Sequence, residues 1–200
     1  MNISIDKQIL AKFKKARRGT LLFIDDFLIF GNYKAISKAL ERLVTKNNII
    51  RIARGIYSLP VIDPKLGEVK PSTEEIAKAI AKKERARIIP SGSIALNALG
   101  LSSQVPMNVV YLTDGSPRKI SLGKRSILFK KTSAKNLILR GEISSLVIQA
   151  LKEIGNGNIT KDEEQIILNH LQKEDINSLE HDIRFAPEWI RKIMRKALKQ

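Results

Sequence analysis

Residues 31–59 read GNYKAISKALERLVTKNNIIRIARGIYSL, which is a turn, a helical pattern and two short apolar runs around a glycine. The first half places apolar side chains at helical spacing, at Ile36, Leu40, Leu43 and Val44. This spacing predicts a helix over about residues 34–46. The second half has β-branched residues on both sides of Ala53-Arg54-Gly55, which predicts two short strands joined by a tight turn.

The residues before this stretch predict two further helices. Apolar residues recur at helical spacing between positions 5 and 13, and Gly19 after Arg17-Arg18 is suited to end that helix. Asp25 and Asp26 begin the second helix, where acidic side chains are stabilised by the positive end of the helix dipole. Three helices followed by a hairpin predict an N-terminal winged helix-turn-helix, and we assign residues 1–62 to it.

The rest of the chain predicts a second domain of a different kind. Residues 63–72 contain prolines and a glycine without apolar periodicity, so we predict a linker there. Residues 73–200 form the second domain, whose first helix begins with a capping box at Ser72 and Glu75. Strands are expected near 88–89, 109–112, 118–122 and 126–131, a short helix at 93–99, and helices from 141 onward with breaks at 155–157 and 186–187. This order favours the α+β class, with a mixed α/β domain and a helical C-terminal tail.

The excess of basic residues in the chain favours a nucleic-acid partner. The chain has 36 Lys and Arg against 20 Asp and Glu, and residues 1–62 alone have 12 against four. A compact particle of this charge favours a polyanionic partner, although a merely soluble basic protein remains the alternative. The chain has no cysteine, no long apolar run and no secretory pattern at its start, so we expect a cytoplasmic protein without a membrane partner.

The predicted winged unit would bring particular side chains into contact with double-stranded DNA. We expect the third helix to enter the major groove, with base-edge candidates Asn32, Lys34, Ser37 and Lys38. Tyr33 is suited to a phosphate or sugar, Arg42 to a phosphate, and Arg51 and Arg54 on the hairpin to phosphates or the minor groove. Two alternatives stay open: these side chains are simply solvated, or the fold is a protein-interaction module.

Three segments also resemble one known family. Residues 50–57, IRIARGIY, are similar to the wing of the abortive-infection (AbiE) type IV antitoxins. Residues 89–102, IPSGSIALNALGLS, are similar to the start of its second domain, and residues 110–115, VYLTDG, continue the match. The resemblance covers about residues 1–130 and is most specific between Pro90 and Gly115.

The resemblance implies a winged-helix transcriptional regulator that represses its own promoter by binding operator repeats there. It implies a second domain that counteracts a nucleotidyltransferase-like toxin in phage defence. The residues that would carry over as DNA contacts are Arg51, Arg54, Lys34, Ser37 and Lys38. A homodimer on DNA would fit repeated half-sites, and neutralisation of a toxin without specific DNA binding is the alternative.

No pattern reaches the standard for an enzyme. His170 and His181 are not spaced to share a helical face as metal ligands, and the acidic run after Thr160 fits a capping box with Glu163. Ser93 and Asp114 suggest a nucleophile and a partner acid, but Ser93 lacks the glycine that closes a nucleophile elbow. We therefore predict no catalytic residue, no metal and no cofactor, and an RNA-modifying or nucleotidyl-transferring enzyme is the least favoured alternative.

The predicted tail helix at 187–198 is strongly amphipathic. Trp189 and four other apolar residues fall on one side, and basic residues including Lys192, Arg195 and Lys199 fall on others. A membrane surface, RNA or an acidic partner would suit such a helix, but we favour packing of its apolar side into the domain.

Overall fold

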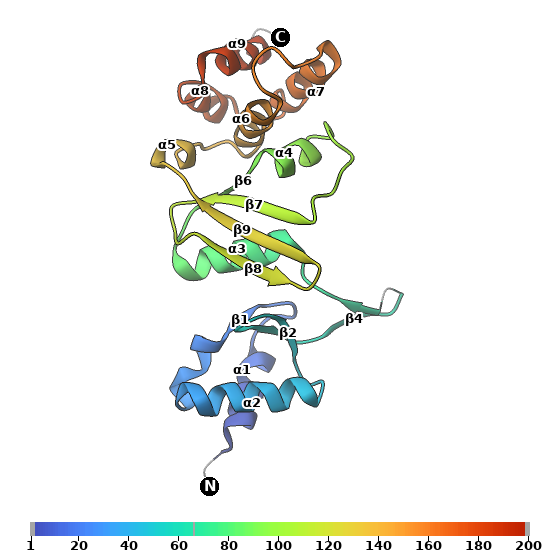
Figure 1. The fold of residues 1–200 in the computed structure, drawn as a ribbon, viewed down its shortest axis with the longest axis vertical. Coiled ribbons are helices and arrows are strands. Elements are labelled where there is room, and N and C mark those ends of the chain that lie inside the picture. Colours follow the sequence, from blue (N-terminus) through green and yellow to red (C-terminus); the bar gives the residue numbers. More distant parts are fainter. Residues whose placement is uncertain (1–2, 66, 199–200) are drawn as a thin grey trace. The chain divides into compact units, whose positions relative to one another are not determined.

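A computed structural model describes residues 3–65 and 67–198, and it contains both helices and sheets (Figure 1). This confirms the predicted α+β class. The chain divides into two compact units, Met1–Ala79 with Ile120–Leu122, and Ile80–Lys119 with Gly123–Gln200. No helix among the described residues is long and apolar enough to cross a membrane.

The first unit has the predicted helices and hairpin in the predicted order. It contains α1 (Ile5–Lys15), β1 (Leu22–Phe23), the 3-10 helix η1 (Ile24–Phe30), α2 (Tyr33–Thr45), β2 (Ile50–Ala53), β3 (Ile56–Ser58), β4 (Val61–Asp63) and β5 (Gly67–Val69). Strands β1, β4 and β5 were not predicted. Strands β1, β3 and β2 form an antiparallel sheet in that order. The second predicted helix is thus a 3-10 helix, in which the Phe23 N–H donates to Asp26 Oδ2 at 2.7 Å.

Helix α1 ends earlier than predicted. We expected Gly19 to close it, but Ala16 already leaves the helix with φ −77° and ψ 151°, while its N–H still bonds to the carbonyls of Lys12 and Phe13. Gly19 does adopt a positive φ of 79°, but it does so in the following turn. The glycine therefore shapes the connection to β1 and does not cap the helix.

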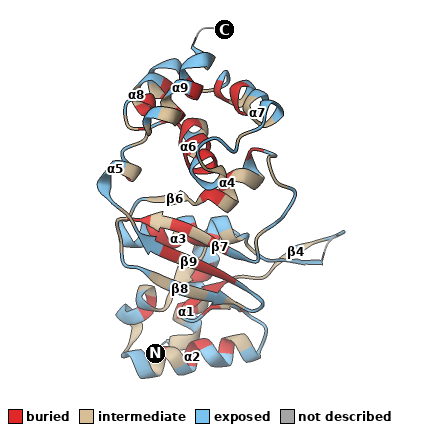
Figure 2. Cartoon of the chain, turned by 45° about the horizontal axis from the view of Figure 1, so that its top comes forward, coloured by how far each residue is buried: buried red, intermediate tan, exposed pale blue. Residues whose placement is uncertain are grey.

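Helices α1, η1 and α2 pack on one apolar core. Ile9, Phe27, Ile36 and Leu40 are fully buried in it, and the Phe13 and Phe27 rings lie 5.3 Å apart between centroids. Buried residues recur between exposed ones along α2, as Figure 2 shows. The apolar residues at helical spacing in the sequence therefore form the buried face of this helix.

The segment predicted as a linker contains regular structure. Strands β4 and β5 pair antiparallel, with Val61 opposite Val69 and Asp63 opposite Gly67. The first compact unit includes this hairpin, which lies within the range 61–69. Its side chains are largely exposed, Ile62 at 66%, so the hairpin has no buried face that an alternating apolar pattern would reveal.

The second unit begins within α3 (Thr73–Glu84) and contains most of a mixed sheet, all but Ile120–Leu122 of its strand β8 (Arg118–Leu122). The predicted capping box is confirmed, because the Ser72 N–H donates to Glu75 Oε2 at 2.7 Å and the Glu75 N–H to Ser72 Oγ at 3.1 Å. The sheet has the order β6-β7-β9-β8, with strands Ile88–Pro90, Asn108–Thr113, Arg125–Lys131 and Arg118–Leu122. Strand β7 is antiparallel to β6 and parallel to β9, so the sheet mixes both pairings.

Six helices complete the second unit. They are α4 (Gly92–Ala98), α5 (Ala134–Leu137), α6 (Glu142–Ile154), α7 (Lys161–Leu171), α8 (Ile176–Ile183) and α9 (Glu188–Ala197) among the described residues. The predicted breaks at 155–157 and 186–187 are present. A further break between α7 and α8 was not predicted, and there Asp175 caps α8 by accepting a hydrogen bond from the Ser178 N–H at 2.8 Å.

Helix α9 packs into the core of the second unit, as favoured from the sequence. Ile190 and Met194 have no exposed surface, and Trp189 lies partly buried against the same cluster. Lys192 and Arg195 are exposed. Lys199, which we assigned to the basic side of this helix, lies outside the described residues.

Candidate nucleic-acid interface

Asn32 begins α2 as its capping residue. Its Oδ1 accepts a hydrogen bond from the Ala35 N–H at 2.9 Å, which satisfies a backbone donor that the helix itself leaves unpaired. The carbonyl oxygen of this predicted base-edge residue therefore already accepts one hydrogen bond, and its second lone pair and the amide nitrogen remain for a base. Tyr33, the first residue of α2, is 57% exposed.

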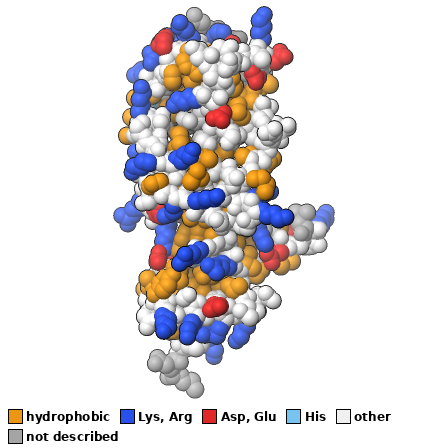
Figure 3. Space-filling model, viewed as in Figure 1, with side chains coloured by type: hydrophobic (Ala, Val, Ile, Leu, Met, Phe, Trp, Pro, Cys, Tyr) orange, Lys and Arg blue, Asp and Glu red, His pale blue; other side chains and the backbone are white. Residues whose placement is uncertain are grey.

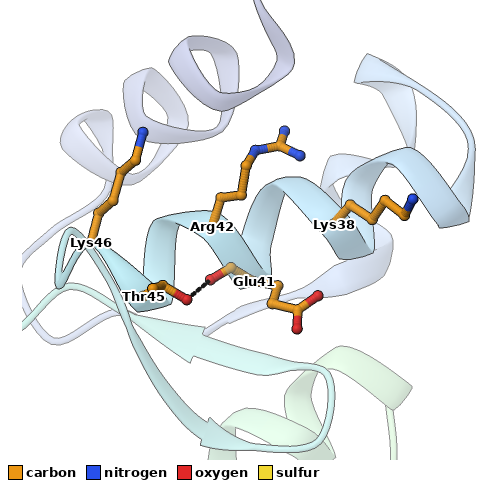
Figure 4. A pocket seen from close by; sticks show the side chains of 5 residues that line it. All are labelled: Lys38, Glu41, Arg42, Thr45 and Lys46. Atoms are coloured by element: carbon orange, nitrogen blue, oxygen red, sulfur yellow. Dashed lines mark hydrogen bonds between the residues drawn. The ribbon is translucent and has the colours of Figure 1, made fainter.

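One side of α2 carries cations at successive turns. Lys38, Arg42 and Lys46 are spaced by four residues and project from the same side of the helix (Figure 4). Lys34 continues this spacing by one turn and is exposed, as is Lys38. Figure 3 shows Lys and Arg side chains gathered along this part of the surface. We call Lys34, Lys38, Arg42 and Lys46 the basic row.

Within the basic row, Arg42 has an intramolecular partner. Its Nη2 donates to Asp6 Oδ1 at 2.6 Å and its Nε to Asp6 Oδ2 at 3.2 Å, so α1 and α2 are joined by a two-pronged ion pair. The hydrogen bonds from Arg42 hold the pKa of Asp6 below its usual range, and Asp6 in turn raises the pKa of Arg42. The guanidinium side chain is still 53% exposed, so a phosphate can approach it from the solvent side.

The β2–β3 hairpin presents the two predicted arginines. Arg51 lies opposite Tyr57, and the register shifts between Arg51 and Ala53, as in a β-bulge. Arg54 precedes Gly55, whose φ of 75° allows the tight turn, and both arginines are exposed. The Ile24 N–H donates to the Gly55 carbonyl at 2.9 Å, which fixes the turn against η1.

A groove separates α2 from this hairpin. It has a volume of about 420 Å³ and brings together Tyr33 and Ser37 from α2 with Arg51 and Arg54 from the hairpin. Tyr57 lines the same groove, and burial raises the pKa of its hydroxyl, with Arg51 acting in the opposite direction. Two guanidinium groups and several hydroxyls around one hollow form a surface suited to an anion such as a backbone phosphate.

The remaining predicted residues lie elsewhere on α2. Lys38 and Arg42 line a second, more open hollow of about 410 Å³, shared with Lys46. Glu41 and Thr45 line both hollows, and neither was predicted to have a task on DNA. Their helical spacing from Ser37 is visible in the sequence, but an acidic residue within a predicted DNA surface offered no reason to choose it.

Asp114, considered in the sequence as a partner acid, is paired with Arg87 in the second unit. The Asp114 carboxylate accepts hydrogen bonds from the Arg87 N–H at 2.7 Å and from Arg87 Nε at 3.0 Å, which also hold its pKa below the usual range. Thr160 and Glu163 form the predicted capping box of α7. Within the described ranges 3–65 and 67–198, no group of three or more metal-ligating side chains comes together.

His181 contacts a buried carboxylate. Its Nδ1 lies 2.8 Å from Asp182 Oδ1, and Asp182 has no exposed surface. The same carboxylate accepts hydrogen bonds from the backbone N–H groups of Arg140 and Gly141, both at 2.9 Å, and from the Ser144 hydroxyl. A buried carboxylate with these partners anchors the start of α6 to α8.

Residues 8–179 match the model of a family of unknown function, DUF6088. The chain belongs to this family. A comparison of this DUF6088 member with curated protein sequences gave no match. Among solved structures, it is similar to the crystal structure of the RV2827C protein from Mycobacterium tuberculosis, with 10% sequence identity and a TM-score of 0.47. That similarity covers 97% of this chain and 82% of the other.

Proposed function

We propose that this chain is a sequence-specific transcriptional regulator that binds double-stranded DNA, and that its first unit is a winged helix-turn-helix. The order of α1, η1 and α2 followed by the β2–β3 hairpin supports this proposal, since such an order places the third helix and the hairpin next to the duplex. In this arrangement α2 enters the major groove and the hairpin lies on the neighbouring backbone.

The observation that carries the proposal is the groove between α2 and the hairpin. Tyr33 and Ser37 line it together with Arg51 and Arg54, although these pairs are well separated in the sequence. Lys38, Arg42 and Lys46 of the basic row line the hollow on the other side of α2, so cations flank the helix on both sides. A helix in the major groove has a phosphate backbone on each side of it, and this distribution of charge matches that geometry.

We also propose a more specific biological role for this chain. Because of the resemblance to the AbiE antitoxins, we propose an autorepressor in the cytoplasm that binds repeats in its own promoter, as a homodimer, without a cofactor. Its second unit would counteract a nucleotidyltransferase-like toxin. Co-expression of a neighbouring nucleotidyltransferase gene with and without this chain tests that part, and toxicity unaffected by the chain would argue against it.

The DNA-binding proposal is tested with the purified full chain and two duplexes. Binding to the DNA upstream of its own gene is compared with binding to a scrambled duplex of equal length across a salt series. We expect tighter binding to the upstream duplex that persists at moderate salt. Equal and steeply salt-dependent binding to both duplexes would mean that the charge of +16 produces only a general attraction for polyanions. It would then favour a protein-interaction role for the first unit.

A further inference from the structure

Glu41 is an acidic residue at the centre of an otherwise cationic surface. It is exposed in the middle of α2, and it lines the hollow of the basic row as well as the groove toward the hairpin. Among the described residues, its carboxylate forms no ion pair with Arg51, Arg54 or a member of the basic row. An ion pair with one of those cations would require a nitrogen–oxygen distance within about 4 Å.

The helical positions explain why Glu41 lies between the two groups of cations. Lys34, Glu41 and Thr45 are separated by seven and four residues, so they follow one line along the exposed face of α2. Lys38, Arg42 and Lys46 lie on one side of this line, and the groove lies on the other. In Figure 4 the Glu41 carboxylate extends away from the side on which Arg42 and Lys46 project.

Glu41 lies between the two groups of cations that would contact phosphates and borders both hollows. If both flanks of α2 contact backbones, the central line faces the floor of the major groove and its base edges. A carboxylate accepts hydrogen bonds and donates none, and it repels phosphate. The major-groove floor does offer donors, the exocyclic amino groups of cytosine and adenine, and carboxylates pair characteristically with cytosine N4.

We infer that Glu41 reads a C·G base pair by accepting a hydrogen bond from cytosine N4, and so selects the sequence that the regulator binds. This inference rests on the proposed DNA-binding function. The carboxylate lowers affinity for duplexes that present an acceptor at that position, guanine N7 or O6 or thymine O4, because it is then desolvated without a donor. Thr45, on the same line along α2, donates from its Oγ1 to the Glu41 backbone carbonyl at 3.1 Å.

The test compares base preferences of the full chain and three variants on the upstream duplex, with each base pair randomised in turn. The variants are Glu41→Gln, Glu41→Ala and, as a control with the same loss of charge at an exposed position on α8, Glu180→Gln. We expect the unmodified chain to prefer C·G at one position by about 5- to 100-fold. Glu41→Ala should lose that preference, and Glu41→Gln should move it toward A·T, because glutamine pairs with adenine N6 and N7.

The outcomes separate this inference from the function on which it rests. If Glu41→Gln and Glu41→Ala bind all duplexes more tightly but keep every base preference, Glu41 only repels phosphate and the inference is overturned, while the regulator stands. If the unmodified chain has no preference at any position, the proposed function fails and the inference fails with it. Because the Glu41 side chain is exposed, we expect both variants to unfold at the same temperature as the unmodified chain.

Discussion

The carboxylate of Asp6 in α1 accepts two hydrogen bonds from the guanidinium of Arg42 in α2, at 2.6 and 3.2 Å. This ion pair joins the first helix to the middle of the basic row. It also means that a cation predicted to contact phosphate is partly neutralised before DNA arrives. The pair therefore sets both the position and the effective charge of Arg42.

Replacing Asp6 with asparagine should release Arg42 for DNA. We expect Asp6→Asn to strengthen binding to any duplex about two- to tenfold and to steepen the dependence of log affinity on log salt by up to about one unit. Titration of a labelled duplex at several salt concentrations measures both. Asp162→Asn, an equal change of charge at an exposed position on α7, is the control. Identical affinity and slope in the Asp6 variant would mean that Arg42 contacts no phosphate.

The same ion pair predicts a pH dependence of folding. The pKa of Asp6 is lower in the folded chain than in the unfolded chain, so the unfolded chain binds more protons as the pH falls. The stabilisation by Asp6 is complete above the ordinary pKa of aspartate, about 4, and is lost as the pH falls through the lowered value. We expect the difference in unfolding free energy between the unmodified chain and Asp6→Asn to be present at pH 7 and to shrink below about pH 4. A difference that grows in acid would contradict this assignment.

The hairpin arginines should contribute phosphate contacts. We expect Arg51→Ala combined with Arg54→Ala to weaken binding to the upstream and scrambled duplexes alike. The salt slope should fall by about one unit for each phosphate that no longer has a cationic partner. The same titration checks this against Arg184→Ala, which removes an exposed arginine from the second unit. Weaker binding confined to the upstream duplex would instead assign these arginines to base recognition.

Asn32 should matter to stability as well as to DNA. Asn32→Ala removes the cap of α2 and should lower the free energy of unfolding by about 1 kcal/mol, whereas Asn32→Asp retains a capping oxygen and should cost much less. Urea denaturation measures both variants. Equal stabilities for the alanine and aspartate variants would show that the hydrogen bond to the Ala35 N–H contributes little.

Asp182 should be the most sensitive polar position of the second unit. Asp182→Ala leaves the backbone N–H groups of Arg140 and Gly141 without an acceptor, so we expect a loss of about 3 kcal/mol or more in unfolding free energy. Glu180→Ala, at an exposed position on the same helix, should change stability by less than about 0.5 kcal/mol. Urea denaturation compares the two variants. A loss for Asp182→Ala as small as that of the control would exclude an anchoring role.

The local elements followed from the sequence because their signals are local. The buried stripe of α2, the glycine turn between β2 and β3, and the capping boxes at Ser72 and Thr160 each depend on residues a few positions apart. Two local features were not predicted. The β4–β5 hairpin has no buried face, and α1 ends before the glycine that was expected to close it.

The sequence by itself determined the α+β class, most element positions and the side chains expected to face DNA. Only the tertiary structure decided which of them act together. The pairing of Asp6 with Arg42, and the groove joining Tyr33 and Ser37 to Arg51 and Arg54, link residues distant in the chain. The central position of Glu41 depends on which face of α2 the core buries and on where the hairpin lies. Periodicity specifies the face of a helix, but packing alone specifies what lies opposite it.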